Sequence, residues 1–424
     1  MAKRAARFDK DRKNREKRRQ KRRALSYEGE PLEEYEEERS RQPMPKWLKR
    51  VLLILLACVL FLLIWFNREN LRPDRVISWV QEGLLGLSQG EGYPVSITGD
   101  QVASGNFQLM GQDVVAVSDT SISILNSSAK ELANRQHSFG TPVLKVEGST
   151  ALLYNQGGKG LQIETRSKTL AKETLEENIL AAAVSSSNLY AVATETQGYL
   201  SKLSVARQGS GGYETFYRYY FSEYYVTDLA LNHDGTRAAA IGIAANGGAM
   251  QSAVYLFDFQ AEQPHAQTEP DFVFEGATLY SVHFLANGRL LVVGDQCASV
   301  INPATGEKTD FHYGGRTLVT YGFNAEDGAV LALSASGDGH SCQIVLLDNA
   351  GQTSEFATDV SAESVSRSNN MIAVLSNGVI YGYSTAGAPQ GEWQVGADAK
   401  KILISSPQFA YVLGISELRS ADLT

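Results

Sequence analysis

The sequence has few of the residues on which reactive and metal-binding sites depend. In 424 residues there are only three cysteines, six histidines and four tryptophans. No C-x-x-C or H-E-x-x-H spacing occurs, so a sequence-local metal site is unsupported. A G-x-S-x-G nucleophile elbow is also missing. Local motifs therefore indicate no catalytic residue, no metal site and no cofactor, and we do not expect an enzyme.

Positive charge is scarce over most of the chain. Residues 1–50 carry 18 Lys and Arg against 10 Asp and Glu, whereas residues 51–424 carry 21 against 37. Such asymmetry indicates two different surroundings. We predict that residues 1–46 form a charged, disordered cytoplasmic tail, because they lack the apolar content to bury a core. The basic run 1–23 has the alternative reading of a site for nucleic acid or anionic lipid. The acidic remainder disfavours a nucleic-acid partner.

Long hydrophobic runs are absent with one exception. Val51–Phe66 has no charge, glycine or proline, and Trp47 and Trp65 lie near its ends. This length and the flanking aromatics predict a transmembrane helix over 47–67. A cleaved signal peptide would start near residue 1 and end in small residues, which this segment does not.

Basic residues concentrate on the N-terminal side of this run. Since positive residues stay in the cytoplasm, we predict a single-pass plasma-membrane protein with a cytoplasmic N-terminus and an extracellular C-terminal domain. The alternative is a cytoplasmic C-terminal domain. Residues 68–92, with PDRVISWVQEGLLGL, predict a short helix and linker.

After Tyr93 no long helical period appears. Short apolar runs instead alternate with Gly, Asn, Asp and Ser turns, and a unit of strands and turns repeats. The units begin at Phe107, Val143, Ile179, Val226, Leu279, Leu318, Ala362 and Lys401. A period of about 40–50 residues with about four strands is typical of β-propeller blades. We predict an all-β, eight-bladed propeller over 93–424, with seven blades as the alternative. The strand candidate Pro94–Gly99 is expected to complete the last blade and close the ring.

The segment LNHDGTRAAAIG, Leu231–Gly242, superficially suggests a calcium loop. A calcium loop needs several carboxylates at alternating positions, and only Asp234 is present. The recurrence of similar segments, such as LANGRLLVV from Leu285, indicates hairpins whose Gly or Asn adopts positive φ.

The strand and turn pattern of LLVVGDQCASVINPATGEK, Leu290–Lys308, resembles the repeat of quinoprotein-like and WD-like propellers, and GAPQGEWQVG, Gly387–Gly396, resembles the end of such a unit. The recurrent tryptophan docking pattern of quinoprotein dehydrogenases is missing, so the resemblance implies a fold and no quinone cofactor. The layout of basic tail, anchor and acidic propeller is similar to a family of Gram-positive single-pass membrane proteins known as domain of unknown function 5711. That resemblance implies a fold and a topology but no reaction.

Two local clusters of chemistry-bearing residues have structural interpretations. SGDGHSC, Ser336–Cys342, gathers Asp, His, Ser and Cys, but the repeat places it in a turn between second and third strands. Catalytic groups usually assemble across a fold. Cys297 and Cys342 occupy matching positions on adjacent blades, where their Cα atoms should be too far apart for a disulfide.

One segment stands out as a candidate binding surface. YETFYRYYFSEYY, Tyr213–Tyr225, has eight aromatic residues in thirteen. A strand there would place Tyr217, Tyr219 and Phe221 on one face, and Phe216 and Tyr220 on the other. A neighbouring insertion, Gln260–Asp271, lengthens the next unit. Tyrosine offers contact area with a polar tip. The candidate partner surface is Tyr213, Phe216, Tyr217, Tyr219, Tyr220, Phe221, Tyr224 and Tyr225. The structural alternative is an outer strand packed on the next blade.

The function expected from these features is a membrane-anchored scaffold that binds an envelope protein or a cell-wall ligand. The first alternative is a propeller hydrolase or lyase with a site in the central channel, because such sites are not local in sequence. The second alternative is a sensor that signals through the basic cytoplasmic tail.

Overall fold

The computed structural model describes Leu55, residues 88–335 and residues 341–424. The chain divides into two units, Met1–Arg72 and Pro73–Thr424, and every described strand lies in the second. The predicted tail, transmembrane segment and short helix fall outside the described residues, apart from Leu55. Within the described part, no helix combines the length and hydrophobicity needed to span a bilayer.

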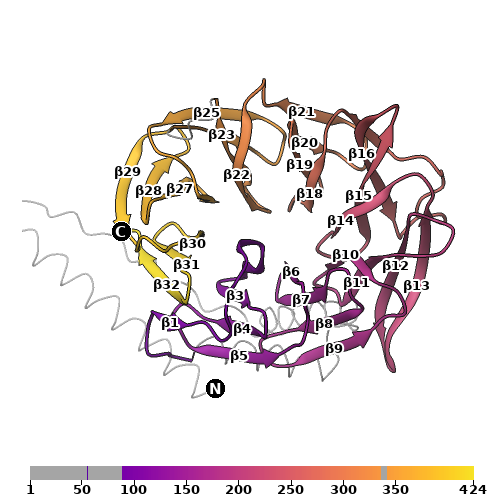
Figure 1. The fold of residues 1–424 in the computed structure, drawn as a ribbon, viewed down its shortest axis with the longest axis horizontal. Helices are drawn as coiled ribbons and strands as arrows, with labels where there is room; N and C mark the ends of the chain where they lie inside the picture. Colours follow the sequence, from indigo (N-terminus) through magenta and orange to yellow (C-terminus); the bar gives the residue numbers. More distant parts are fainter. Residues whose placement is uncertain (1–54, 56–87, 336–340) are drawn as a thin grey trace, which may run out of the picture. The chain divides into compact units, whose positions relative to one another are not determined.

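The strands form eight antiparallel sheets of four strands each, arranged as the blades of a ring (Figure 1). Blades 1 to 7 are β2–β5, β6–β9, β10–β13, β14–β17, β18–β21, β22–β25 and β26–β29, and blade 8 is β30–β32 with β1. The eight-bladed prediction is therefore confirmed, and the seven-bladed alternative is wrong. Each innermost strand begins within two residues of the predicted repeat start.

The innermost strands line the centre of the ring (Figure 1). They are β2 (Phe107–Met110), β6 (Pro142–Glu147), β10 (Ile179–Val184), β14 (Tyr225–Leu231), β18 (Leu279–Phe284), β22 (Thr317–Asn324), β26 (Ser364–Ser368) and β30 (Lys401–Ser406). The second strands are β3 (Asp113–Val117), β7 (Thr150–Asn155), β11 (Leu189–Thr194), β15 (Arg237–Asn246), β19 (Leu290–Gly294), β23 (Gly328–Ser334), β27 (Met371–Ser376) and β31 (Phe409–Leu413).

The third and outermost strands complete the blades. The third strands are β4 (Ser121–Leu125), β8 (Gly160–Glu164), β12 (Ser201–Gly209), β16 (Ala249–Asp258), β20 (Cys297–Ile301), β24 (Cys342–Leu347), β28 (Val379–Ser384) and β32 (Glu417–Asp422). The outermost strands are β5 (Glu131–Gln136), β9 (Thr169–Thr174), β13 (Gly212–Phe221), β17 (Phe272–Glu275), β21 (Lys308–His312), β25 (Thr353–Thr358), β29 (Pro389–Gln394) and β1 (Val95–Ser96). A 3-10 turn, η1 (Ser104–Asn106), precedes β2.

Differences in burial explain why some strands are continuously apolar in sequence and others alternate between apolar and polar residues. Every residue of β19 and β23 is buried, since a second strand is covered on both faces by its neighbouring blades. Outermost strands such as β5 alternate or are exposed. Eight hydrophobic clusters fill the spaces between neighbouring blades, one cluster for each pair, including blades 8 and 1. Stacking the blades thus buries faces that a single sheet would leave in water.

The two faces of the ring differ in the connections they carry. Each blade is an antiparallel meander, so the chain leaves the outermost strand at the same end where the next innermost strand begins. We call this end the start face and the opposite end, with the first hairpin of each blade, the turn face. The predicted hairpin turns are confirmed: Gly235 and Gly288 have φ of 70° and 78°, a region that glycine tolerates best.

The ring closes where the two ends of the propeller meet. β1 pairs with β32 through Val95 and Leu418, which confirms that Pro94–Gly99 contains the closing strand. The hydroxyl of Tyr411 in blade 8 donates a 2.7 Å hydrogen bond to the carbonyl of Gln112 in blade 1. Just before β1, the nitrogen of Gly92 donates to the carbonyl of Ser128, which lies on the turn face. The chain therefore reaches the propeller at the turn face.

Candidate functional site

The aromatic segment forms β13, the outermost strand of blade 3 (Figure 1). Its pairing with β12 slips by one residue between Val205 and Ala206, which leaves Phe216 as an extra residue in a β-bulge. Phe216 and Tyr217 consequently both contact the ring of Phe259, each with a centroid distance of 5.6 Å. The prediction that Phe216 lies on the opposite face from Tyr217 is therefore wrong, because strict alternation stops at a bulge.

The other residues on this side of β13 pack against blade 4. The ring of Tyr219 lies 5.3 Å from that of Phe257, and the ring of Phe221 lies 4.9 Å from that of Tyr255. Phe221 is 1% exposed. Burial raises the pKa of Tyr217 to about 12. Tyr217, Tyr219 and Phe221 thus belong to the hydrophobic contact between two blades, as in the structural alternative.

The insertion between β16 and β17 is fastened to the same aromatic contact by His265. Its side chain is 2% exposed, and its ring lies 5.1 Å from that of Tyr219. The Nδ1 atom is 2.9 Å from the carbonyl of Leu256, and the Nε2 atom is 3.2 Å from the carbonyl of Glu269. The insertion therefore covers part of β13 rather than standing free.

Two more of the predicted residues are also mainly structural. Tyr213 contacts Tyr190 of the same blade, with ring centroids 5.0 Å apart, and the Tyr190 hydroxyl donates to Glu173 at 2.7 Å. Tyr224 is 5% exposed and lies 6.0 Å from the ring of Tyr255. Neither side chain presents a free aromatic face to a partner.

Three of the predicted residues remain exposed. Phe216, in the middle of β13, is 43% exposed and has the Arg207 guanidinium 4.8 Å from its ring centroid, whereas Tyr220 and Tyr225 lie on the start face. Their exposures are 44% and 39%, and Tyr199 and Leu200, in the connection between β11 and β12, are 48% and 44% exposed. The rings of Tyr199 and Tyr220 contact each other with centroids 4.9 Å apart. We call Tyr199, Leu200, Tyr220 and Tyr225 the start-face patch. It crosses from the rim of blade 3 to the inner strand of blade 4.

Apolar exposure continues along this face beyond the patch. Met250 in blade 4 is 44% exposed and Tyr280 in blade 5 is 54% exposed. Met250 lies near the tip of the β15–β16 hairpin. This hairpin pairs as far as residues 246 and 249, past the first pair between β14 and β15, Tyr225 with Ile243. The tip therefore projects beyond the neighbouring strand end beside the patch.

Carboxylates surround the patch. Glu195 and Glu223 are both exposed. The pKa of Tyr225 is raised mainly by its partial burial and, to a smaller extent, by the negative charge of Glu195. The Asn178 amide donates to Glu195 at 2.8 Å. Lys202 forms an ion pair with Glu177 at 2.7 Å. Among the described residues, neither Glu195 nor Glu223 forms an ion pair with a lysine or arginine, so both carboxylates are free to meet a cation of a partner.

A second polar cluster lies on the innermost strands of blades 2, 4, 5 and 6. Lys145 Nζ is 2.5 Å from Asp228 Oδ1, and Asp228 Oδ2 accepts a 3.1 Å hydrogen bond from the nitrogen of Val282. The Tyr321 hydroxyl is 2.7 Å from the Ser281 hydroxyl. These groups satisfy one another, which is typical of a structural network inside a fold.

His283 is the unusual member of this inner cluster. Its ring stacks on Phe323 with centroids 4.3 Å apart, and its buried Nε2 has no hydrogen-bond partner among the described residues. Burial, reinforced by the nearby Lys145 charge, lowers the pKa of His283 to about 4. The imidazole is therefore neutral at pH 7 and is not poised for proton transfer there.

His233, from the segment that suggests a calcium loop, has a structural role. Its Nδ1 is 2.8 Å from Glu147 Oε1 and 3.2 Å from Ser186 Oγ. These contacts join the turns of blades 2, 3 and 4 on the turn face. Throughout the described part of the chain, no group of three or more His, Cys, Asp and Glu could hold a metal ion.

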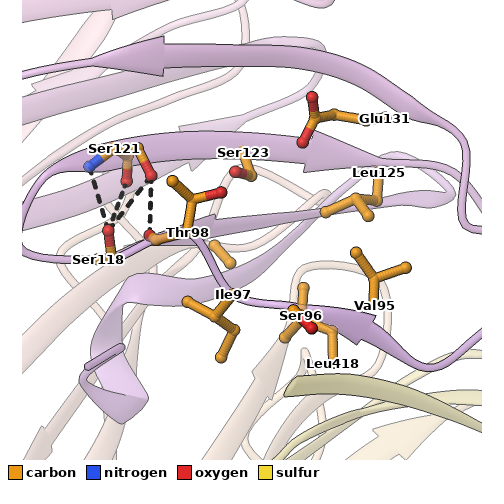
Figure 2. Close-up of a pocket in the computed structure, with 11 residues that line it drawn as sticks. Val95, Ser96, Ile97, Thr98, Ser118, Ser121, Ser123, Leu125, Glu131 and Leu418 are labelled. Carbon is orange, nitrogen blue, oxygen red and sulfur yellow. Dashed lines mark hydrogen bonds between the residues drawn. The ribbon is translucent and has the colours of Figure 1, made fainter. Parts of the chain in front are cut away.

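A small cleft lies at the closure seam between blades 8 and 1 (Figure 2). It has about 280 Å³ of empty space, including its open mouth, and its lining mixes hydroxyl-bearing and apolar residues in equal number. The Ser121 hydroxyl already donates to the carbonyl of Thr98 at 3.0 Å, and Ser118 and Ser121 bond to each other, as Figure 2 shows. The lining comes from β1, β32 and blade 1, so the cleft belongs to the closure seam.

The two cysteines occupy matching positions on adjacent blades, as the repeat predicts. Cys297 and Cys342 are free and buried, and each begins the third strand of its blade. The first part of SGDGHSC, residues 336–340, lies outside the described residues. The segment falls between β23 and β24, the second and third strands of blade 6, as the repeat predicts.

Tyr199, Leu200 and Tyr280 belong to the exposed apolar surface of the start face but are not among the residues identified from the sequence. Tyr199 and Leu200 stand in a connection where two apolar residues follow ETQG. An exposed aromatic residue in a polar turn was the available signal. Tyr280 lies one residue into a strand and gives no signal, since only the neighbouring blades decide whether it is covered.

Comparison with known proteins finds a family and a fold. A family model described as "Family of unknown function (DUF5711)" matches residues 90–418. No curated protein matches the chain. The structure of Sqt1 from Saccharomyces cerevisiae is similar, with 11% identity over 79% of this chain and 100% of that chain, and a TM-score of 0.51. The C-terminal WD40 domain of Sif2 shares 12% identity over 78% of this chain and 99% of that chain, with a TM-score of 0.51. At such identities the likeness extends to the propeller fold alone.

Proposed function

We propose, from the premise that this chain belongs to the DUF5711 family of unknown function, that it is a binding scaffold of the cell envelope. Its propeller would hold a protein partner on the start-face patch. The proposal includes the membrane anchor at residues 47–67 and an extracytoplasmic propeller, both of which rest on the hydropathy and charge of the sequence.

The observation that carries the proposal is the exposure of the start-face patch. Tyr199 and Tyr220 contact each other yet remain nearly half exposed, whereas their neighbours Tyr219 and Phe221 pack against blade 4. Clustered exposed aromatic side chains are characteristic of protein interfaces. Within the described residues, the chain joins β1 at the turn face through the Gly92–Ser128 hydrogen bond, at the opposite end of the ring from the patch.

The inner cluster supports an enzymatic site less well. A catalytic site needs a group that is free to react and a pKa suited to its task. Lys145 is paired with Asp228, and the Tyr321 hydroxyl is hydrogen-bonded to Ser281. The imidazole of His283 stays neutral down to about pH 4. This arrangement supports a role in holding blades together.

Crosslinking in intact cells tests the scaffold. The full chain, tagged at its C-terminus, is compared with a variant that carries Tyr199→Ser, Tyr220→Ser and Tyr225→Ser. The matched control carries Val319→Ser and Ile415→Ser, which are exposed on blades 6 and 8. We expect a reproducible envelope protein with the wild type and the control, and its loss with the patch variant. The absence of any partner, or equal capture by all three chains, would contradict the proposal.

Topology needs its own measurement. In intact cells, a membrane-impermeant biotin reagent should label lysines of the propeller and leave those of residues 1–46 unlabelled until the cells are opened. The reverse pattern would contradict the extracytoplasmic placement. Deleting residues 1–40 should preserve partner capture, whereas its loss would favour the alternative that the tail transmits a signal.

A further inference from the structure

We infer that the partner segment docking on the start-face patch is cationic, a lysine- or arginine-bearing stretch of a second protein. This inference rests on the proposed function and specifies its partner. Three features support it: the paired tyrosine rings, the carboxylates beside them, and the absence, among the described residues, of an ion pair between either carboxylate and a lysine or arginine. Lys202, the cross-strand partner of Tyr220, is paired with Glu177 instead.

The tyrosines provide the surface for a cation. Tyr199 and Tyr220 have ring centroids 4.9 Å apart with an interplanar angle of 40°, so each ring supports the other and keeps its outer part in solvent. The negative face of an aromatic ring attracts ammonium and guanidinium groups. Arginine also stacks flat on tyrosine.

The carboxylates stand in the connections that carry the tyrosines. Glu195 opens the β11–β12 connection that contains Tyr199, and Glu223 lies between Tyr220 and Tyr225 in the connection from β13 to β14. Burial is the main cause of the raised pKa of Tyr219 and Tyr224, and the charge of Glu223 raises both further. Both glutamates are therefore close to the aromatic side chains and face water.

Charge decides between partner chemistries. An acidic peptide would bring like charges together at Glu195 and Glu223, which costs free energy. A wholly apolar segment would cover the tyrosines, but it would also remove water from the carboxylates without offering them a hydrogen-bond donor, which costs free energy. Only a basic segment satisfies the rings and the carboxylates together, because its cations can pair with glutamate and lie on tyrosine.

Fluorescence anisotropy with the purified full-length chain tests the inference. The probe is a labelled Gly-Ser peptide with four arginines, and the comparison probe has four glutamates in their place. We expect binding of the arginine probe only, with an affinity that falls as salt is raised. The double variant Glu195→Gln and Glu223→Gln should weaken binding about tenfold, as expected for two exposed charge contacts.

A matched control separates this site from the general acidity of the chain. The double variant Glu326→Gln and Glu392→Gln removes the same charge from exposed positions on blades 6 and 7 and should bind the probe like the wild type. Equal weakening in both double variants, binding of the glutamate probe, or no binding of either probe would overturn the inference. Binding that appears only after residues 1–40 are deleted would also overturn it, because the chain's own basic run would then be the occupant.

The same variants distinguish this inference from the proposed function. If the wild type captures an envelope partner in cells and Glu195→Gln with Glu223→Gln captures it equally, the scaffold stands and the cationic partner does not. If no chain captures a partner, the scaffold itself fails. Thermal unfolding of each variant verifies that it remains folded, since both glutamates are exposed and should leave the Tm unchanged.

Discussion

Lys145 of blade 2 and Asp228 of blade 4 form an ion pair 2.5 Å long, although blade 3 lies between them. The innermost strand of blade 3, ILAAAV, carries three alanines. These alanines are buried in the clusters on the two sides of blade 3. Asp228 also accepts a hydrogen bond from Val282 in blade 5. One carboxylate therefore connects three blades around the centre of the ring.

Replacing Lys145 should destabilise the propeller more than a surface substitution would. In Lys145→Met, Asp228 keeps its charge, while its side chain is only 9% exposed. An uncompensated carboxylate at such a position costs roughly 3 kcal/mol in the free energy of unfolding. Urea unfolding monitored by tryptophan fluorescence measures the change. Adding Asp228→Leu should recover part of the loss. If Lys145→Met unfolds at the wild-type urea concentration, the ion pair has no structural role.

Acid should weaken the fold through His283. Its pKa is about 4 in the folded protein and about 6.5 when unfolded. Between these values the unfolded chain binds more protons, so the free energy of unfolding falls as the pH drops from 6.5 towards 4. This group alone should account for about 2 kcal/mol between pH 7 and pH 5. The variant His283→Gln should lose correspondingly less stability over that interval. Identical pH profiles for the two chains would contradict the assignment.

Adjacent tyrosines on β13 should respond to the same substitution with losses of stability that differ in size. Tyr219→Ser removes ring contacts with Phe257, Tyr255 and His265, and should lower the free energy of unfolding by about 3 kcal/mol. Tyr220→Ser removes a ring that is 44% exposed and should change it by less than about 1 kcal/mol. Thermal unfolding compares the two variants. Equal losses would mean that the start-face patch is part of the core.

Closure of the ring should depend on one hydroxyl. Tyr411→Phe deletes the hydrogen bond to Gln112 between blades 8 and 1 and keeps the buried ring. We expect a loss of about 1 kcal/mol. Tyr381→Phe in blade 7 is the control, because its hydroxyl has no hydrogen bond among the described residues. Hydrogen exchange should localise the effect of Tyr411→Phe to β31 and to the β2–β3 turn that contains Gln112, and an effect spread evenly over all blades would argue against it.

Only part of the binding surface could be anticipated. The density of aromatic residues in Tyr213–Tyr225 identified β13, yet most of those rings pack against neighbouring residues. Which rings stay exposed depends on the bulge at Phe216 and on the insertion held by His265. Both depend on contacts between residues far apart in sequence, so no local pattern shows them. Tyr199 joins Tyr220 for the same reason.

By itself the sequence determined the blade number, the strand order, the turns at Gly235 and Gly288, and the closing strand at Val95. These features follow from local periodicity and from backbone angles that only certain residues adopt, so they can be read along the chain. The tertiary structure alone decided that Lys145 meets Asp228, that His283 is neutral, and that Tyr219 is covered while Tyr220 is open. Those outcomes depend on which blade lies against which side chain, because burial and electrostatic environment are properties of the closed ring.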